Sequence, residues 1–378
     1  MREDDVQLFR CLECGGALEA TAVRTVGSVM ESALLHCPTC AAAYPVVEGV
    51  AVFFPRELQG VYLGATEREF LGRNGIDVGT APTLSGGAKA QHAAAANWEY
   101  QWQTVQPFTA ADLTRNPDDF YGENTFWRFI PLPREAVRGK TVFIGGGGRG
   151  REAFHLWNAG AARLIVNEIG AEIYAIRDLF PDALERIVLV RGDLCRLPLV
   201  SHCADIAICD HALQHVLDHR KGYQELSRLT RPGGMVAVCV YSHEGNFVMT
   251  RVIEPSKQLL HRLPLRAQRI LALGPAGLLF LHIHLLVVPL AHLSPRLARA
   301  LPLGPFLLFW AKAKFAFVWM SCFDFIHAPI SYHFHRAEME ALATSCSHVI
   351  EALQHTHRTL WSMVVRKPAP SESRAAAG

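Results

Sequence analysis

A run of four glycines at residues 145–148, within TVFIGGGGRGR, constrains the fold of this chain more than any other stretch. Residues 141–144, Thr-Val-Phe-Ile, are expected to form a short buried strand, and the polar residues after Gly150 begin a helix. Glycines at a strand-to-helix turn let the backbone approach a ligand, and the following helix N-terminus attracts an anion. The stretch therefore predicts a loop that binds a pyrophosphate or the carboxylate of an amino acid, with a merely flexible loop as the alternative.

Two glycine fingerprints fit this loop. Gly145, Gly147 and Gly150 match the G-x-G-x-x-G pattern of dinucleotide-binding proteins. Gly146, Gly148 and Gly150 match the G-x-G-x-G spacing of proteins that bind S-adenosylmethionine (SAM). The loop alone does not choose between them, so the residues that follow must decide.

After the loop, apolar strands alternate with amphipathic helices. The expected strands are 141–145, 163–167, 187–191, 205–209 and 235–241, and the expected helices are 151–159, 171–180 and 222–229. Continuous apolar strands with crossover helices predict an α/β fold with a Rossmann-like, doubly wound, mostly parallel sheet covered on both faces. Ligands bind such sheets at the carboxyl ends of the strands.

Acidic residues follow three of these strands. Glu168 ends the second strand, 18 residues after Gly150, where it can accept hydrogen bonds from both hydroxyls of a ribose or cap the next helix. Asp193 and Leu194 follow the third strand, where an acid can accept from an adenine amino group or make an Asx-turn. Asp210 ends the fourth strand.

The stretches VFIGGGGRGREA, NEIGAE, VRGDLCRLPL and ADIAICDHALQHVLDHRKGYQELSRLTRPGGMVAVCV together resemble a class I SAM-dependent methyltransferase of the type 11-like kind. A nicotinamide dehydrogenase shares the first loop and Glu168, but it has no reason for the other motifs. The resemblance covers residues 91–245 and resumes near the C-terminus. It implies SAM as the cofactor, bound by Gly146, Gly148 and Gly150 at the methionyl end, Glu168 at the ribose, Asp193 and Leu194 at the adenine, and Asp210 nearby.

One position departs from this family. Relatives usually carry an acidic residue at the position of Ile144, where it helps to place the methionine amino group. We expect Ile144 to point toward the glycine loop and to weaken, rearrange or abolish cofactor binding. No catalytic residue is assigned, because His211, His215, Tyr241 and His243 lie near strand ends but each histidine is more often structural.

Cys11, Cys14, Cys37 and Cys40 form two C-x-x-C pairs separated by 22 residues. Each pair fits a tight knuckle, and four thiolates complete a closed tetrahedral zinc site. Because no coordination position stays open, we expect a structural rather than a catalytic zinc. The other six cysteines occur singly and are expected to be small core hydrophobes.

The cysteines belong to a second resemblance. LFRCLECGGALEA and LLHCPTCAAAYPVVEGVAVFF resemble the small zinc-ribbon domain that activates transfer-RNA and protein methyltransferases. The match covers roughly residues 8–55 and includes the four cysteines and the Tyr-Pro and Glu-Gly-Val segments after them. It implies a zinc ribbon fused ahead of the methyltransferase domain, as in bacterial relatives.

The expected domains are a zinc ribbon over 1–57, a linker over 58–90, a methyltransferase domain over 91–245, an apolar helical insertion over 246–330, the rest of the methyltransferase domain over 331–368, and a flexible tail over 369–378. Aromatic residues over 91–135 pack on the next domain or close over a cofactor. After the insertion we expect a helix over 336–346 and an antiparallel hairpin of 348–353 and 359–366.

The insertion contains two apolar runs. Residues 270–295 contain no Asp, Glu, Lys or Arg, and 301–311 are also apolar. The first run is long enough to span a bilayer, but prolines, glycines and histidines interrupt it. We expect 270–311 to be a lid over the acceptor site. Peripheral contact with a membrane surface is the second interpretation, and a true span is the third.

The sequence therefore predicts a SAM-dependent methyltransferase with a structural zinc and an unidentified small, apolar, lipid-like acceptor. The alternatives are a catalytically degenerate methyltransferase fold that serves as a binding or scaffold protein, and an RNA- or protein-directed methyltransferase. A net charge of +2 provides no broad phosphate-binding surface, so no nucleic-acid partner is expected. Ten cysteines and a charged start predict a cytoplasmic location, or one peripheral to the membrane.

Overall fold

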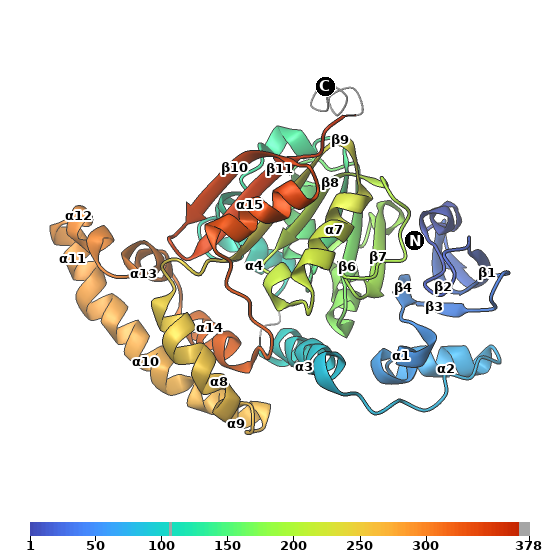
Figure 1. The fold of residues 1–378 in the computed structure, drawn as a ribbon, viewed down its shortest axis with the longest axis horizontal. Coiled ribbons are helices and arrows are strands. Elements are labelled where there is room, and N and C mark those ends of the chain that lie inside the picture. Colours follow the sequence, from blue (N-terminus) through green and yellow to red (C-terminus); the bar gives the residue numbers. More distant parts are fainter. Residues whose placement is uncertain (106–107, 370–378) are drawn as a thin grey trace.

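One continuous sheet of eleven strands forms the centre of the computed structural model, which describes residues 1–105 and 108–369 (Figure 1). In sheet order the strands are β1 (Glu19–Val26), β2 (Val29–His36), β3 (Ala43–Val47), β4 (Val50–Phe53), β7 (Ile187–Gly192), β6 (Arg163–Glu168), β5 (Thr141–Gly145), β8 (Ala204–Asp210), β9 (Thr230–Tyr241), β11 (Leu360–Arg366) and β10 (Val349–Thr356). The strands from β4 to β9 pair in parallel. The predicted α/β fold with a mostly parallel central sheet is confirmed.

Helices cover both faces of the parallel strands. They are α5 (Glu123–Phe129), α6 (Arg151–Asn158), the 3-10 helix η4 (Ala171–Leu179), α7 (His219–Leu229) and α15 (Arg336–Ser345). Alternate residues of β5 face the two layers, because side chains along a strand point to opposite faces. Phe143 packs in the layer of α7 and α15, and Ile144 packs in the layer of α5, α6 and η4.

The chain reverses direction across the sheet at β5. From β5 it runs through β6 to β7 on one side, and then returns to β8 and β9 on the other. In a doubly wound sheet, the loops at the carboxyl ends of such neighbouring strands diverge and leave a crevice. The glycine loop after β5 and the turn after β8 lie at this point.

The N-terminal unit is not a separate layer. Its strand β4 pairs in parallel with β7 from Val50 opposite Leu189 to Phe53 opposite Gly192, so the ribbon strands extend the central sheet. The backbone nitrogen of Arg10 also donates to the Pro198 carbonyl at 2.7 Å. The expected boundary near residue 57 therefore separates two sequence patterns that share one sheet.

Residues 58–90, expected as a linker, contain regular structure. The segment holds most of α1 (Arg56–Tyr62), all of α2 (Ala65–Arg73) and the start of α3 (Gly86–Tyr100). A buried ion pair anchors α2 to the sheet, since the Arg191 guanidinium on β7 lies 2.6 Å from the Glu67 carboxylate. The chain before the insertion also contains six shorter helical elements. They are η1 (Glu3–Leu8), η2 (Gln101–Val105), α4 (Ala110–Arg115), η3 (Arg134–Val137), η5 (Leu184–Arg186) and η6 (Leu213–His215).

The insertion is helical, as expected, and projects from one side of the body (Figure 1). Its elements are η7 (Met249–Ile253), α8 (Glu254–Leu260), α9 (Leu265–Leu271), α10 (Leu273–His282), η8 (Ile283–Val287), α11 (Val288–Leu293), α12 (Pro295–Ala300), α13 (Gly304–Trp310) and α14 (Phe315–His327). A core of its own joins α10 and η8 to α13 and α14, with Ala276, Ile283, Leu307 and Phe323 buried in it. The expected flexible tail lies outside the described residues, apart from Ala369.

Candidate functional site

The glycine loop joins β5 to α6 in a conformation that requires glycine at two positions. Gly146 has φ of 70°, and a Cβ there would lie 2.2 Å from the Cβ of Ala212. Gly150 has φ of 95° and precedes α6, and a Cβ there would lie 2.9 Å from Leu179. The left-handed backbone and the close packing both exclude side chains, which explains why the sequence places glycines here.

Glu168, at the end of β6, lies beneath this loop. Its carboxylate accepts a hydrogen bond from the Gly148 backbone nitrogen at 2.8 Å, and from those of Ile169 and Gly170 at 2.7 and 3.3 Å. Burial raises the pKa of Glu168, although these backbone N–H groups oppose that shift. Glu168 thus holds the shape of the loop, a role that the sequence analysis did not foresee.

Asp193 and Leu194 follow β7 and lie across the crevice from the loop. The Asp193 carboxylate accepts from the Cys195 backbone nitrogen at 2.9 Å, which is the Asx-turn that the sequence left as an alternative. Both side chains nevertheless line the same cavity as Gly148 and Glu168. A hydrogen-bonding acid and an apolar neighbour are therefore available together at this end of the cavity.

Arg151, the first residue of α6, forms buried ion pairs at the wall of the cavity. Its guanidinium lies 2.6 Å from the Glu152 carboxylate and also binds the Asp210 carboxylate. The other Asp210 oxygen lies 2.6 Å from Nδ1 of His211. Burial acts to raise the pKa of Asp210, but His211 and Arg151 outweigh it and hold that pKa below its usual range. Both oxygens of Asp210 are thus already paired.

One cavity connects these groups. Of the predicted cofactor residues, all but Gly150 line it: Gly146, Gly148, Glu168, Asp193, Leu194 and Asp210. Gly150 packs behind the loop against Leu179. Glu172 also lines the cavity, and both of its buried carboxylate oxygens lack a hydrogen-bond partner among the described residues. The polar half of the cavity therefore offers backbone amides and carboxylates to a ligand.

The other half of the cavity is aromatic and apolar. The insertion supplies Phe306, Phe309, Trp310, Phe317, Met320, Ser321, Asp324 and Phe325, and the segment before β5 supplies Trp98, Trp102, Phe108, Phe120, Tyr121 and Phe129. Of the predicted lid over 270–311, only α13 lines the cavity, together with α14, which lies beyond those bounds. The long run from α9 to α11 lies on the outer side of α14 (Figure 1). The aromatic cover over 91–135 lines the cavity as well as packing on the sheet.

The Ile144 side chain lies against the glycine loop, as expected, since a Cβ at Gly147 would lie 3.6 Å from Cγ2 of Ile144. It is fully buried in the layer that contains Val142, Val166 and Ala153, and it is absent from the cavity lining. At the position where relatives usually carry an acidic residue, this chain therefore has a buried core residue.

The candidate bases occupy different places. His211, His215 and Tyr241 line the cavity, whereas His243 does not and instead stacks on His335 with ring centroids 4.0 Å apart. Burial lowers the pKa of His215 to about 3, and its Nδ1 lies 2.7 Å from the Ile330 carbonyl oxygen. His215 is therefore neutral at physiological pH.

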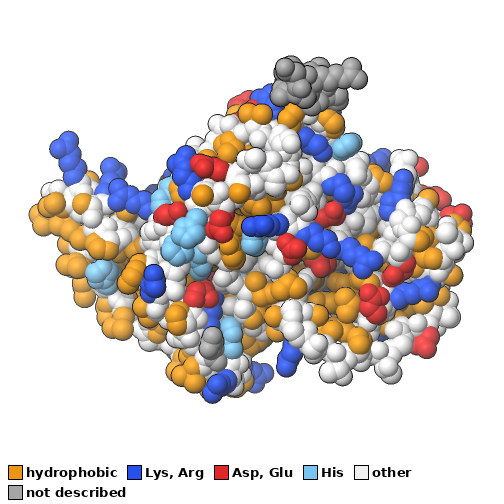
Figure 2. All heavy atoms as spheres, in the orientation of Figure 1, with side chains coloured by type: hydrophobic (Ala, Val, Ile, Leu, Met, Phe, Trp, Pro, Cys, Tyr) orange, Lys and Arg blue, Asp and Glu red, His pale blue; other side chains and the backbone are white. Residues whose placement is uncertain are grey.

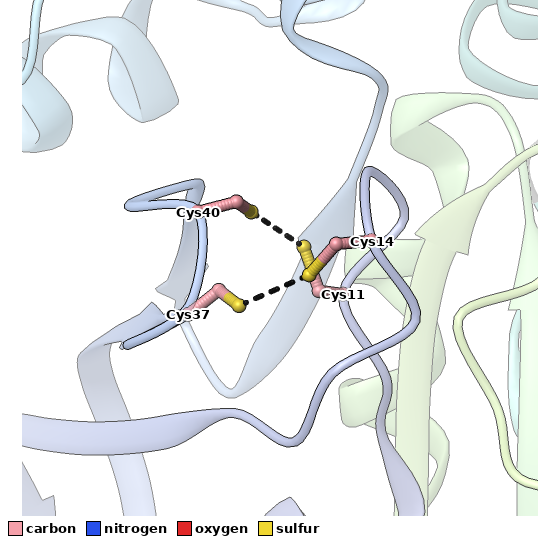
Figure 3. Close-up of side chains that lie close together, drawn as sticks. All are labelled: Cys11, Cys14, Cys37 and Cys40. Atoms are coloured by element: carbon pink, nitrogen blue, oxygen red, sulfur yellow. Dashed lines mark hydrogen bonds between the residues drawn. The ribbon is translucent and has the colours of Figure 1, made fainter.

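The four cysteines of the N-terminal pattern come together as expected (Figure 3). Sγ of Cys11 lies 3.5 Å from Sγ of Cys40, and Sγ of Cys14 lies 3.5 Å from Sγ of Cys37. All four sulfurs lie within 4.8 Å of one another. This spacing fits four thiolates around one tetrahedral ion at about 2.3 Å from each.

Comparison with known proteins agrees with this geometry. Residues 144–238 match the family model described as a methyltransferase domain. The chain carries a methyltransferase domain. This match begins in β5 and ends in β9, so it contains the glycine loop and the strand ends that line the polar half of the cavity. The matched residues also include β6, β7 and β8, which are parallel strands of the central sheet.

Curated relatives match the same region. A demethylmenaquinone methyltransferase of Mycolicibacterium vanbaalenii is 31% identical over 97 residues, which are 26% of this chain and 42% of that protein. Another of Mycobacterium bovis is 26% identical over 157 residues, covering 41% of this chain and 62% of that protein. The chain thus spans less than two thirds of the length of these relatives.

A solved structure also aligns. It is a complex between a methyltransferase activator and a methyltransferase from Haloferax volcanii. One chain of that complex matches at 12% identity with a TM-score of 0.39, and the match covers 65% of this chain and 92% of the matched chain.

Several residues that line the cavity were not among the cofactor-binding residues predicted from the sequence. Arg151, Glu152 and Glu172 lie in helices whose patterns indicate only amphipathic packing. Asp324 had a detectable signal, because it is the only acidic residue between Glu254 and Glu338. An isolated acid in a long apolar segment is costly unless it has a specific role.

Proposed function

We propose that this protein is a SAM-dependent methyltransferase that acts on a small, apolar, lipid-like acceptor. The observation that carries the proposal is the single cavity with two unlike halves. One half has the glycine loop, Glu168 and Asp193, and the other has aromatic side chains from the insertion. A polar cofactor and an apolar acceptor would meet where these halves join.

The residues present fit SAM. Gly146 and Gly148 would receive the methionyl end, Glu168 the ribose, and Asp193 with Leu194 the adenine, with Gly150 shaping the start of α6. The unpartnered carboxylate of Glu172 supplies a further acceptor for ligand N–H or O–H groups in the polar half. When bound, SAM supplies an electrophilic methyl group; the chain orients both ligands and excludes water from them.

The acceptor class follows from the other half of the cavity. Its aromatic walls favour a ligand with large apolar surface, and few polar groups are present there to bind a sugar or a peptide. The names of the curated relatives, demethylmenaquinone methyltransferases, support a lipid-like acceptor. An RNA- or protein-directed activity is less well supported, because an aromatic cavity offers few groups to a phosphate backbone or a peptide.

We place the protein in the cytoplasm and peripheral to a membrane. The helical run Leu265–Leu293 has 29 residues and mean hydropathy of 2.1, and by length and composition it could cross a bilayer, but that is weak evidence of a span. Leucines on its outer face are exposed, among them Leu278 (73%), Leu285 (72%) and Leu293 (85%). In Figure 2 hydrophobic side chains cover much of this projection, and basic side chains lie at its ends.

Charge and packing favour surface contact over a span. Residues 255–323 contain eight Lys and Arg and no Asp or Glu, although the whole chain has a net charge of only +2. Basic residues next to exposed leucines suit an anionic lipid surface. On its inner side the run packs through Ala272, Ala276 and Ile283 against α13 and α14, and a spanning helix would have to leave this core.

The N-terminal cluster is proposed to hold one structural zinc through Cys11, Cys14, Cys37 and Cys40. The donor set supports this, because four thiolates in mutual contact leave no open coordination position. Since β3 and β4 follow the second cysteine pair, the ion would stabilise the knuckles that lead into the edge of the central sheet.

Methyl transfer can be tested directly. The purified protein is incubated with SAM labelled in its methyl group and with a bacterial lipid extract, and the label is followed into the organic phase. We expect label in a lipid product, and loss of that label in Glu168→Ala. Label only in RNA or protein fractions would favour the macromolecule-directed alternative. Binding of SAM with no label in any fraction would favour the scaffold alternative.

A further inference from the structure

Among the described residues, the insertion contributes one carboxyl group to the cavity lining. Asp324 lies on α14, and it is the only charged residue that the insertion contributes to the cavity lining. Its neighbours in that lining include Phe317, Ser321 and Phe325, so its surroundings are almost entirely apolar. The group thus lies where the acceptor, rather than the cofactor, is proposed to bind.

Oδ1 of Asp324 lacks a hydrogen-bond partner among the described residues. The nearest basic group to this buried oxygen, Nε2 of His327, lies 3.7 Å from it, which is too far for a hydrogen bond. The side chain is 20% exposed, and because it lines the cavity we take that exposure to face the cavity. An unpaired buried carboxyl group requires an explanation in a native fold, and a ligand group would provide one.

The nearby groups indicate what kind of ligand suits Asp324. Burial raises the pKa of Asp324 well above its usual range, so its carboxylate, once ionised, is a stronger base than that of an ordinary aspartate. Tyr121 and Tyr241 line the same cavity and lie close enough for Asp324 to influence their ionisation. A hydroxyl group can donate a hydrogen bond to the buried Oδ1 of Asp324, and it costs less to bury among these apolar side chains than an ammonium group does.

We propose that Asp324 recognises the hydroxyl group of an apolar, ring-containing acceptor and removes its proton. The O–H bond of the acceptor breaks, and the proton forms a new O–H bond on the Asp324 carboxylate. The electron pair stays on the acceptor oxygen, and the proton later passes to water. This inference rests on the proposed methyl transfer, in which a deprotonated acceptor is the better nucleophile.

Recognition can be tested without turnover and without SAM. The probes are 2-naphthol and naphthalene, which share a ring system and differ by one hydroxyl group, and binding is measured by quenching of tryptophan fluorescence. We expect wild type to bind 2-naphthol at least tenfold more tightly than naphthalene. Equal affinities would overturn the proposal, and so would tighter binding of 2-naphthylmethylammonium, because the carboxylate would then be a cation site.

Two variants test whether the preference for 2-naphthol over naphthalene depends on the Asp324 side chain. Asp324→Leu is expected to bring the two affinities within about twofold of each other, while naphthalene binding stays at the wild-type level or improves. Ser321→Ala is the matched control, because it removes a hydroxyl group from the same helix and the same cavity. It should keep the tenfold preference. Loss of the preference in Ser321→Ala but not in Asp324→Leu would overturn the assignment.

The removal of the proton is tested by a separate measurement, the absorbance spectrum of bound 2-naphthol. Asp324→Asn keeps an oxygen that accepts a hydrogen bond but cannot take up a proton. In wild type, the absorbance of bound 2-naphthol should show the naphtholate form, and in Asp324→Asn it should show only naphthol. Naphthol spectra in both proteins would overturn the deprotonation step. A parallel SAM titration separates the proposals, since wild type that binds SAM without the hydroxyl preference refutes only the role of Asp324.

Discussion

The Glu168 carboxylate accepts a hydrogen bond from the Gly148 backbone nitrogen at 2.8 Å, so one buried side chain both shapes the glycine loop and lines the cavity. The residue that we propose as the ribose ligand thus also holds the loop proposed for the methionyl end. Its pKa is raised by burial despite three backbone N–H donors, and a ligand that donates hydrogen bonds would stabilise its charge further.

Glu172 should make stability fall with rising pH. Burial, and then the neighbouring Glu168, raise the pKa of Glu172 well above its ordinary value of 4.5. The folded state therefore binds this proton more tightly than the unfolded state does. The resulting stabilisation is complete below about pH 4.5 and is lost as pH rises through the folded-state pKa.

Glu172→Gln tests this dependence, because it removes the titrating group and keeps the shape. Above pH 5, urea unfolding should show the variant gaining stability relative to wild type as pH rises. Asp324 titrates in both proteins and does not affect the difference, whereas the mutual repulsion of Glu168 and Glu172 is part of it. Parallel curves for the two proteins would show that Glu172 has a partner in solution.

Ile144→Asp should destabilise the fold rather than improve cofactor binding. Ile144 is fully buried between apolar residues, and an uncompensated carboxylate there should cost on the order of 3 kcal/mol or more in free energy of unfolding. Ile144→Val is the control, with an expected cost of about 1 kcal/mol. A stable Ile144→Asp protein with tighter SAM binding would mean that the side chain faces the cavity after all.

The parallel centre of the fold was predictable because each expected strand is a short apolar run, and four of the five are followed by a glycine or an acid. These local patterns locate the strands, but they predict the strand order only when combined with the general rules of doubly wound sheets. The addition of β4 to β7 was not predictable, since Val50–Phe53 fits a ribbon strand and a sheet strand equally well. Pairing between segments so distant in sequence leaves no local signal.

The site was predictable to a similar degree. Glycine spacing and acids at strand ends located Gly146, Gly148, Glu168 and Asp193 at one cavity. Ile144 lies against the glycine loop as predicted, but its burial outside the cavity was not predictable, because the alternation along β5 does not say which layer each face meets. The role of α13 and α14 depends on how the insertion folds back, which composition does not reveal.

The cysteine cluster should bind one zinc per chain. Elemental analysis of the purified protein should find one zinc, and the double variant Cys37→Ser and Cys40→Ser should contain none and melt at a lower temperature. The double variant Cys203→Ser and Cys346→Ser is the control, because these half-buried thiols lie outside the cluster. Zinc retained in the first variant would refute the assigned ligands.

The projecting arm should bind anionic vesicles. Wild type should sediment with vesicles containing phosphatidylglycerol, less with pure phosphatidylcholine, and less at high salt. Replacing Leu278, Leu285 and Leu293 by serine should reduce binding at least tenfold. The control replaces Val23 and Val26, which are 56% and 54% exposed on β1, and should bind as wild type does. Binding that resists carbonate and high salt would indicate a span instead.

Calorimetric titration of the purified protein with SAM tests the central claim most directly. We predict saturable binding of one SAM per chain, and a loss on the order of 2–4 kcal/mol in Glu168→Ala, because two charge-assisted hydrogen bonds to the ribose and the support of the loop disappear together. Absence of SAM binding in a folded wild-type protein, or saturable binding of NAD in its place, would contradict the account.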